Sequence, residues 1–252
     1  MKRISRMVVL VCLLAGLIGT QPGAAEKSNI HLSAQESAVS ATTVLKVDDL
    51  SLRRAVAYCT DKAALVRSVY PTLTTDQVNA LVSDSFIHAD HWAYAPSSYQ
   101  YPYAPDVGRA LLDAAGWTVG LDGIRKNAEG IRLALKMTTT SADFRKTWAA
   151  VFEQQMAACG IQLVRYHTPA AWWFGDTTGL MRRDFELAAF AWVGQVDPGG
   201  RTRYACDQIP SQENGWVGQN YMGWCNPIAS EAIIAANTTL IQDERETAFA
   251  TV

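Results

Sequence analysis

Two acidic residues stand at a spacing that suits catalysis. Asp184 and Glu186 lie two positions apart in a predicted strand, so both carboxyl groups would point to one face of a sheet. Paired carboxyl groups carry out glycoside hydrolysis, which makes a secreted glycoside hydrolase one alternative. Arg182 and Arg183 stand beside them, and a surface cluster of salt bridges explains the same four residues. No G-x-S-x-G elbow, P-loop or H-E-x-x-H motif accompanies them, so we expect a protein that is not an enzyme.

Two cysteines bracket a loop that is rich in tryptophan, glycine, asparagine and glutamine. A disulfide between Cys206 and Cys225 would pin this loop and remove roughly 3 kcal/mol of chain entropy. A bound zinc is the alternative, although no second pair of ligands stands at a suitable spacing. Cys59 and Cys159 fall in apolar helical patterns and are predicted to be buried as small hydrophobic residues. The sequence therefore predicts Cys206–Cys225 as the only disulfide.

A pair of histidines is the other candidate for metal chemistry. His88 and His91 are three positions apart with Asp90 between them, which is a conceivable start of a metal site. No third ligand is evident in the sequence around them. We therefore expect no bound metal and no cofactor.

Aromatic residues supply the candidate ligand contacts. Trp172 and Trp173 stand next to each other in a predicted loop, where they either wall a pocket or cover the core. Trp216, Asn220 and Trp224 belong to the loop between Cys206 and Cys225, and we expect them to face a ligand cleft. Exposed tryptophan and glutamine side chains would equally suit a carbohydrate-binding module.

The N-terminal end has the layout of a secretory leader. Residues 1–25 hold three basic residues, then an apolar run over residues 7–18, then small residues at the cleavage position. The run is too short to span a bilayer, although an uncleaved anchor is the alternative. A lipid anchor at Cys12 is disfavoured because Val11 precedes it, where a small residue is needed. Residues 26–48 are rich in Ser, Ala and Thr and are predicted to form a linker.

Export and charge together restrict the partners. The whole chain has a formal charge of −2, and the predicted leader contributes only basic residues, so the remainder is more acidic. Because no basic patch stands out, nucleic acid and anionic membranes are poor partners. We expect a periplasmic or extracellular protein that has no direct membrane span once the leader is removed.

The apolar periodicity predicts an α/β fold in which one strand–helix–strand unit positions the candidate residues. The two strands of this unit should be parallel and joined by a right-handed crossover. A third strand, nearly continuously apolar, should lie buried at the centre of the sheet. The expected elements are a helical pattern over 52–69 that Thr60-Asp61 divides in two, a helix from Pro105 to the cap at Gly116, a strand over 131–137, a helix over 141–159, a strand over 161–166, a strand over 184–192 and a closing helix over 229–252.

Six stretches stand out by their order and spacing along the chain. They are "LRRAVAYCTDKAALV", "YPYAPDVGRALLDAAGW", "ADFRKTWAAVFEQQMAACGIQL", "DFELAAFAW", "GQNYMGWCNP" and the closing helix with Arg245. In this order and spacing, they resemble the bacterial extracellular solute-binding proteins of family 5, which are dipeptide, oligopeptide and nickel receptors of ABC importers. The resemblance covers nearly everything after about residue 48.

The resemblance implies a fold and a domain organisation. It implies a periplasmic-binding-protein-like lobe of the type II solute-binding proteins, with a mixed, largely parallel sheet flanked by helices. Members of the family are much longer and hold their ligand between two lobes. We therefore expect residues 49–252 to be the C-terminal lobe, with the N-terminal lobe absent. Such a half-receptor should bind no small ligand tightly by itself.

The resemblance also implies partners and a ligand contact. The partners would be a small solute, peptide-like or a sugar, and an ABC permease in the membrane. Trp192 matches a tryptophan of the peptide-binding members, and Gln195 stands three residues on, where they have an aspartate that pairs with the ligand's amino group. The glutamine argues against zwitterionic peptides. A core aromatic residue at the end of a strand is the alternative for Trp192.

Overall fold

The computed structural model describes residues 7–8, 49–97 and 99–252. The predicted leader, apart from Met7 and Val8, and the predicted linker lie outside the described residues, and so does Cys12. The described chain contains both helices and strands, as the α/β prediction requires. Within the described ranges, no helix combines the length and the apolar character that a bilayer span demands.

The predicted strand–helix–strand unit is confirmed, although its first strand begins three residues later than predicted. Strand β4, Ala134–Thr140, leads through helix α5, Asp143–Ala158, into strand β5, Gln162–Thr168. The strands run parallel, with Leu135 opposite Leu163. These two leucines lie opposite each other on neighbouring strands, so their side chains point to the same face of the sheet. Both are buried.

The predicted third strand is much shorter than expected. Strand β6 comprises only Leu187–Ala188 and pairs in parallel with β4, while β1, Met7–Val8, pairs with its other edge. The sheet order is β1-β6-β4-β5, so β6 is central, as predicted. The chain leaves the sheet after Ala189 because Phe190 packs instead against Tyr221, with ring centroids 6.0 Å apart.

Local signals placed several helix boundaries correctly. Helix α1, Leu50–Tyr58, ends just before Thr60, and helix α2, Lys62–Val69, begins after Asp61. The Asp61 carboxylate accepts a hydrogen bond from the Ala64 amide at 2.9 Å and so caps α2. Helix α4, Pro105–Ala114, starts on a proline, and Gly116 follows its end with φ +84°.

The largest core lies between the sheet and helices α1, α2, α4 and α5. The predicted inner face of α5 is confirmed for Trp148, Phe152 and Met156, all of which are buried. Phe144 was predicted on the same face, but it is 38% exposed. It lies in the first turn of α5, where the guanidinium group of Arg145 covers its ring at 5.1 Å.

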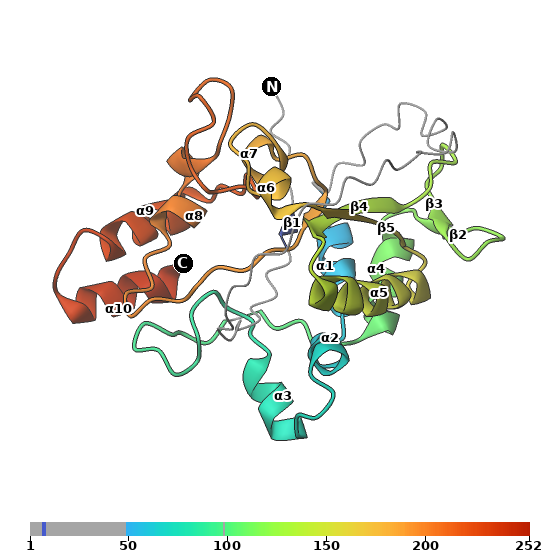
Figure 1. Ribbon diagram of the computed structural model, residues 1–252, viewed down its shortest axis with the longest axis horizontal. Helices are drawn as coiled ribbons and strands as arrows, with labels where there is room; N and C mark the ends of the chain where they lie inside the picture. The colour runs from blue at the N-terminus through green and yellow to red at the C-terminus, as the bar shows by residue number, and fades with distance from the viewer. Residues whose placement is uncertain (1–6, 9–48, 98) are drawn as a thin grey trace, which may run out of the picture.

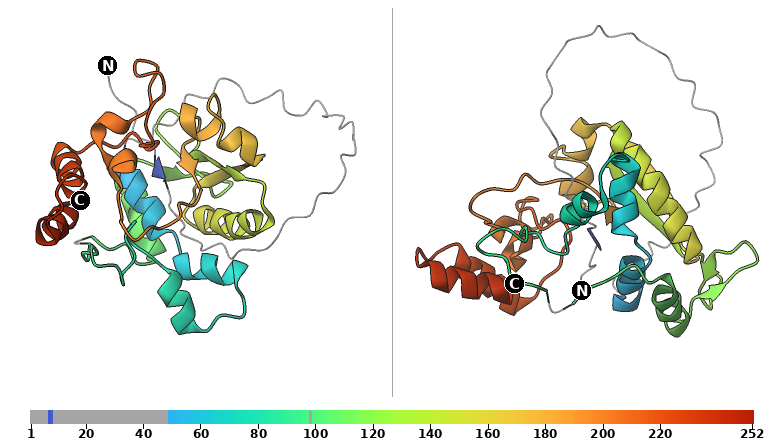
Figure 2. Two further views of the ribbon diagram at one scale, coloured as in Figure 1. Left: turned by 60° about the vertical axis from the view of Figure 1, so that its left-hand side comes forward. Right: turned by 90° about the horizontal axis from the view of Figure 1, so that it is seen from below.

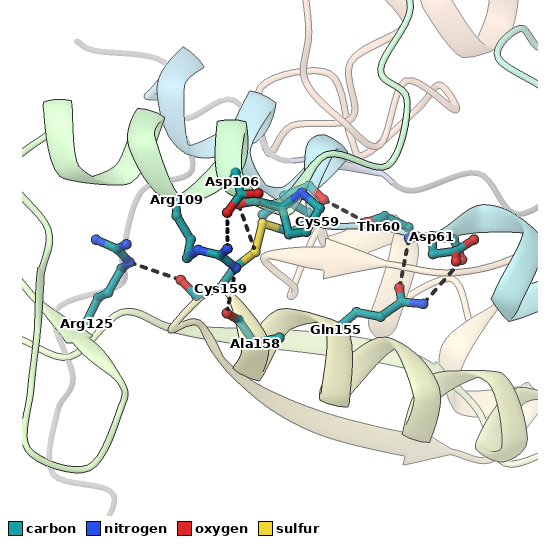
Figure 3. Close-up of a disulfide and its surroundings, with 11 residues drawn as sticks. Cys59, Thr60, Asp61, Asp106, Arg109, Arg125, Gln155, Ala158 and Cys159 are labelled. Atoms are coloured by element: carbon teal, nitrogen blue, oxygen red, sulfur yellow. Dashed lines mark hydrogen bonds and ion pairs between the residues drawn. A yellow bond between two sulfur atoms is a disulfide. The ribbon is translucent and has the colours of Figure 1, made fainter.

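The prediction of a single disulfide is wrong. Cys59 at the end of α1 and Cys159 at the end of α5 form a disulfide, with their Cα atoms 6.4 Å apart (Figure 3). Both residues are buried as predicted, but the packing of α1 and α5 against one core brings their two C-terminal ends together. The Cys206–Cys225 disulfide is also present.

Polar contacts join the same elements around the Cys59–Cys159 disulfide. Arg109 of α4 reaches the Ala158 carbonyl oxygen at 3.3 Å, and Gln155 of α5 accepts from the Asp61 amide at 3.1 Å (Figure 3). Arg125 is buried, and its Nε donates to the Cys159 carbonyl oxygen at 3.0 Å. Helices α1, α2, α4 and α5 are therefore locked to one another by both covalent and polar links.

The C-terminal part forms a separate group of helices. Helices α8, α9 and α10 lie to one side in Figure 1, away from α1, α4, α5 and the β4–β5 pair, and the right-hand view of Figure 2 shows the red C-terminal helices apart in the same way. The predicted closing helix is two helices, because Asn237 ends the first one. The remaining bounds are α3 Thr75–Leu81, α6 Ala170–Trp173, α7 Gly179–Arg182, α8 Arg201–Tyr204, α9 Pro227–Ala236, α10 Gln242–Thr251, the 3-10 helix Cys206–Gln208, and the hairpin of β2 Thr118–Val119 with β3 Arg125–Lys126.

Candidate ligand-binding groove

A groove of about 690 Å³ opens where three hydrophobic clusters of the described chain meet. We call it the central groove. The large core contributes Leu65 to its lining, the cluster around β6 contributes Phe190 and Tyr221, and the cluster of the C-terminal helices contributes Ile87 and Phe249. A site of this size and this apolar character suits a small organic solute.

Trp192 lines the central groove. Its ring lies edge-on to Phe190, with centroids 5.8 Å apart, and its side chain is only partly buried. Trp192 therefore packs on the core four residues beyond the end of β6 and also presents a surface to the groove, while its contact with a ligand stays a prediction. Gln195, three residues on, is exposed and is not among the residues that line the groove.

The loop that carries Trp192 and Gln195 is tethered just beyond them. His91 Nε2 lies 2.9 Å from the Val196 carbonyl oxygen, and Trp92 Nε1 donates to the same oxygen at 3.4 Å. Arg245 of α10 pairs with Asp197, with Nη2 and Oδ2 2.7 Å apart. The two candidate residues thus stand on a loop that is held at its far end by two separate segments.

Two of the predicted ligand contacts are internal. Trp173 is fully buried and packs edge-on against Phe185, so the alternative that it covers the core is correct and its prediction as a ligand contact is wrong. Trp172 packs, partly buried, on the same cluster. Asn220 is fully buried, and its Nδ2 donates to the carbonyl oxygens of Ala205 and Trp224. It holds the loop together and cannot reach a solute, which corrects its prediction as well.

The loop between Cys206 and Cys225 does not line the central groove with its tryptophans. Trp216 has a left-handed backbone, with φ +64°, and the Arg182 guanidinium group stacks on its ring at 4.5 Å. Trp224 is 37% exposed and likewise lies outside the groove lining. The loop does contribute Gln219 and Tyr221 to the groove.

Sequence reasoning did not identify Arg203, the cation beside Trp192 in the groove. Arg203 of α8 lines the groove, and its guanidinium carbon lies 5.6 Å from the ring centroid of Trp192 and 5.9 Å from those of Phe86 and Tyr204. These distances are those of cation–π contacts. No spacing in the sequence points to this group, because Phe86 comes from a loop far away in the chain. Burial also raises the pKa of Tyr221, which keeps its hydroxyl protonated in the groove wall.

The carboxyl groups of Asp184 and Glu186, which the sequence offered as a catalytic alternative, have partners in the neighbouring strand. Lys136 Nζ lies 3.0 Å from Asp184 Oδ1, and the Glu186 carboxylate accepts a hydrogen bond from the Lys136 amide. Through Lys136, the two carboxyl groups therefore join the segment just before β6 to strand β4. Within the described part of the chain, no group of three or more potential ligands is placed to hold a metal ion.

Comparison with known proteins supports the same fold. The model of the family "Bacterial extracellular solute-binding proteins, family 5 Middle" matches residues 28–207, beginning inside the segment predicted as a linker. No curated protein sequence matches the chain at a significant level. Many solved structures do match it.

Three of these structures are oligopeptide-binding proteins. The protein of Thermus thermophilus complexed with a pentapeptide has a TM-score of 0.68 and 22% identity over 79% of this chain and 34% of its own. AppA of Bacillus subtilis in complex with a nonapeptide has a TM-score of 0.63 and 19% identity, over 80% of this chain and 39% of its own. The mannohexaose-bound protein of Thermotoga maritima has a TM-score of 0.62 and 18% identity, over 79% of this chain and 38% of its own.

These likenesses confirm the predicted fold, a lobe of the periplasmic-binding-protein type. The chain spans little more than a third of the length of the solved proteins it matches. The family model, by contrast, covers well over half of the chain itself. The chain therefore belongs to family 5 of the bacterial extracellular solute-binding proteins.

Proposed function

We propose that the chain is one lobe of a substrate-binding component of an ABC importer, which captures a peptide-like solute outside the cytoplasmic membrane and delivers it to the permease. Family membership supports a binding role, and two of the similar structures hold peptides in their sites. The predicted leader over residues 1–25 would export it. The observation that carries the proposal is the central groove with Trp192 in its wall.

The central groove supplies one wall of a ligand site. Sites for small molecules enclose ~70–90% of the ligand surface, which a single open wall cannot do. We therefore expect the chain alone to bind its solute weakly, with a dissociation constant of about a millimolar, equivalent to roughly 4 kcal/mol. A second lobe closing over the groove would supply the remaining affinity.

Gln195 limits which peptides are acceptable. A buried ammonium group is stabilised by charge-assisted hydrogen bonds of about 1.5–3 kcal/mol, against roughly 1 kcal/mol for a neutral partner. The Gln195 amide can make only the weaker, neutral hydrogen bond. Because Gln195 is exposed in this lobe, we expect it to contact the solute where a second lobe closes over the groove. The favoured solutes are therefore blocked peptides, amides or sugars that carry no free ammonium group at this point.

Equilibrium titration of the purified chain with peptides and oligosaccharides through the millimolar range tests the proposal. We expect N-blocked peptides to bind, and Trp192→Ala to weaken their binding at least about tenfold because it removes the aromatic wall. Trp224→Ala is the matched control, since it removes the same side chain from outside the groove lining.

The outcomes separate the candidate functions. Binding of oligosaccharides alone would favour the carbohydrate-binding alternative, to which the mannohexaose bound by the Thermotoga maritima protein lends support. Peptide binding that Trp192→Ala and Trp224→Ala weaken equally would put the site outside the central groove. Binding of neither class would overturn the proposal.

A further inference from the structure

The central groove contains a positively charged side chain that no acidic side chain balances. Three of the side chains that line it are charged, and all belong to the described residues: Lys62, Asp84 and Arg203. Lys62 and Asp84 form an ion pair with each other. In the described part of the chain, no ion pair joins Arg203 to an acidic side chain or to the carboxylate of Val252, so the guanidinium group has no direct counter-charge.

Most of the hydrogen-bonding capacity of Arg203 remains unused by the protein. A guanidinium group has five N–H donors in a planar fork that matches a carboxylate. In the described structure, its hydrogen bond is the one from Nη2 to the Pro198 carbonyl oxygen at 3.0 Å. That bond holds one edge of the fork against the loop that follows Trp192 and leaves other donors free for an anion.

The surroundings of Arg203 favour an organic anion over inorganic phosphate or sulfate. Aromatic rings of Phe86, Trp192 and Tyr204 lie within 6 Å of the guanidinium carbon and fix its orientation. Because all three rings are partly buried, they reduce the contact of the guanidinium group with water, which strengthens a charge-assisted hydrogen bond made beside them. The rest of the groove has a mixed lining with more apolar than polar surface, and it is large enough for side chains attached to a carboxylate.

We propose that Arg203 binds a carboxylate of the solute, so that the central groove selects peptide-like acids over their neutral counterparts. The proposal rests on the function proposed above, since it names a group of the solute that the groove receives. Taken with Gln195, it describes a solute that has a free carboxylate and no free ammonium group. An N-acylated peptide or N-acylated amino acid has this chemistry.

A purely structural role for Arg203 makes a different prediction. If the contacts of Arg203 with Pro198 and the three rings only hold the loop in place, then removing Arg203 would weaken the binding of acids and of amides by the same factor. Carboxylate binding requires instead that the acid and the amide differ in affinity, and that this difference disappears with the guanidinium group. The ratio of the two affinities therefore separates the two roles.

The experiment compares N-acetyl-dialanine with its C-terminal amide, using NMR titration of the full chain in the millimolar range. We expect the acid to bind wild type about tenfold more tightly than the amide. Arg203→Gln should bring the two within about twofold of each other. Arg201→Gln is the matched control, because Arg201 lies in the same short helix, pairs with Asp207 at 2.7 Å and is absent from the groove lining.

Each other outcome contradicts a specific step. Equal binding of acid and amide by wild type overturns carboxylate recognition but leaves the proposed function standing, and this comparison needs no folded variant. Loss of the preference in Arg201→Gln as well would show a general effect of charge and overturn the role of Arg203. If neither compound nor any other peptide binds wild type, the proposed function fails and this inference fails with it.

Discussion

Arg245 Nη2 lies 2.7 Å from Asp197 Oδ2, and this ion pair joins helix α10 to the loop that carries Trp192. Arg245 also donates from Nε to the Ala236 carbonyl oxygen at 2.8 Å and stacks on Trp92 at 4.9 Å. The last helix is thereby bound to the preceding one and to the loop at the edge of the groove. A single arginine in the closing helix thus couples the C-terminal helices to the candidate site.

This ion pair makes stability depend on acid pH. Burial acts to raise the pKa of Asp197, but hydrogen bonds from Arg245 and the Gly199 amide outweigh it and hold that pKa below the usual value. Because the folded pKa is lowered, the stabilisation is present above the unfolded pKa of about 3.9 and is lost as the pH falls through the folded value. The carboxylate is 57% exposed, so the effect should be below about 1 kcal/mol.

The substitution Asp197→Asn tests whether the ion pair with Arg245 makes stability depend on pH. We expect a melting temperature a few degrees below wild type at pH 7, and a difference that shrinks as the pH falls below about 4. Asp176→Asn is the control, since it removes an exposed carboxyl group that has no ion pair among the described residues. A difference between Asp197→Asn and wild type that stays constant from pH 7 to pH 2 would contradict the assignment.

The two disulfides should differ in their effect on stability. Cys59 and Cys159 are 100 residues apart, whereas Cys206 and Cys225 are 19 apart. In the chain-entropy model, a longer closed loop restricts the unfolded chain more, by about 4.7 kcal/mol for the first pair and about 3 kcal/mol for the second. Replacing both cysteines of each pair by alanine and measuring urea unfolding should give the larger loss for the first pair. Equal losses, or the reverse order, would argue against this account.

Gly223 should accept a side chain less readily than Gly215 does. Its φ is +68°, and a Cβ there would run into the Arg183 guanidinium group, whose Nε donates to the Tyr221 carbonyl oxygen at 3.1 Å. Gly215 of the same loop has φ +66°, but open space surrounds its Cβ position. We expect Gly215→Ala to cost about 1 kcal/mol from the backbone alone, and Gly223→Ala to cost clearly more, as measured by urea unfolding. Equal losses for the two variants would show that Arg183 moves aside freely.

Local chemistry predicted the fold well where one segment decides its own structure. Pro105 and Gly116 bound α4 because a proline fits the first turn and a glycine accepts the left-handed backbone after the last one. The alternating apolar residues of β4 and the inner face of α5 led to the parallel unit in the same way. The Asp61 cap divided α1 from α2 for an equally local reason.

Features that depend on contacts between distant parts of the chain could not be predicted from the sequence. Cys59 meets Cys159 only because α1 and α5 pack on the same core, and each looks like an ordinary buried residue in its own helix. Trp173 and Asn220 are of types that suit a binding site, but burial is decided by residues elsewhere in the chain. Arg203 contacts the aromatic rings of Phe86 and Trp192, and no spacing in the sequence predicts that these three residues lie together.

The central claim is that a solute meets this lobe in the central groove, beside Trp192. The chain has eight tryptophans, and each indole N–H gives its own signal in a ¹⁵N-correlated NMR spectrum. On titration with an N-acetylated peptide, we predict that the Trp192 indole signal moves, while those of Trp148 and Trp173, fully enclosed in the hydrophobic clusters, stay in place. A shift of the Trp216 or Trp224 signal with Trp192 unchanged would contradict the claim and put the site on the loop between Cys206 and Cys225.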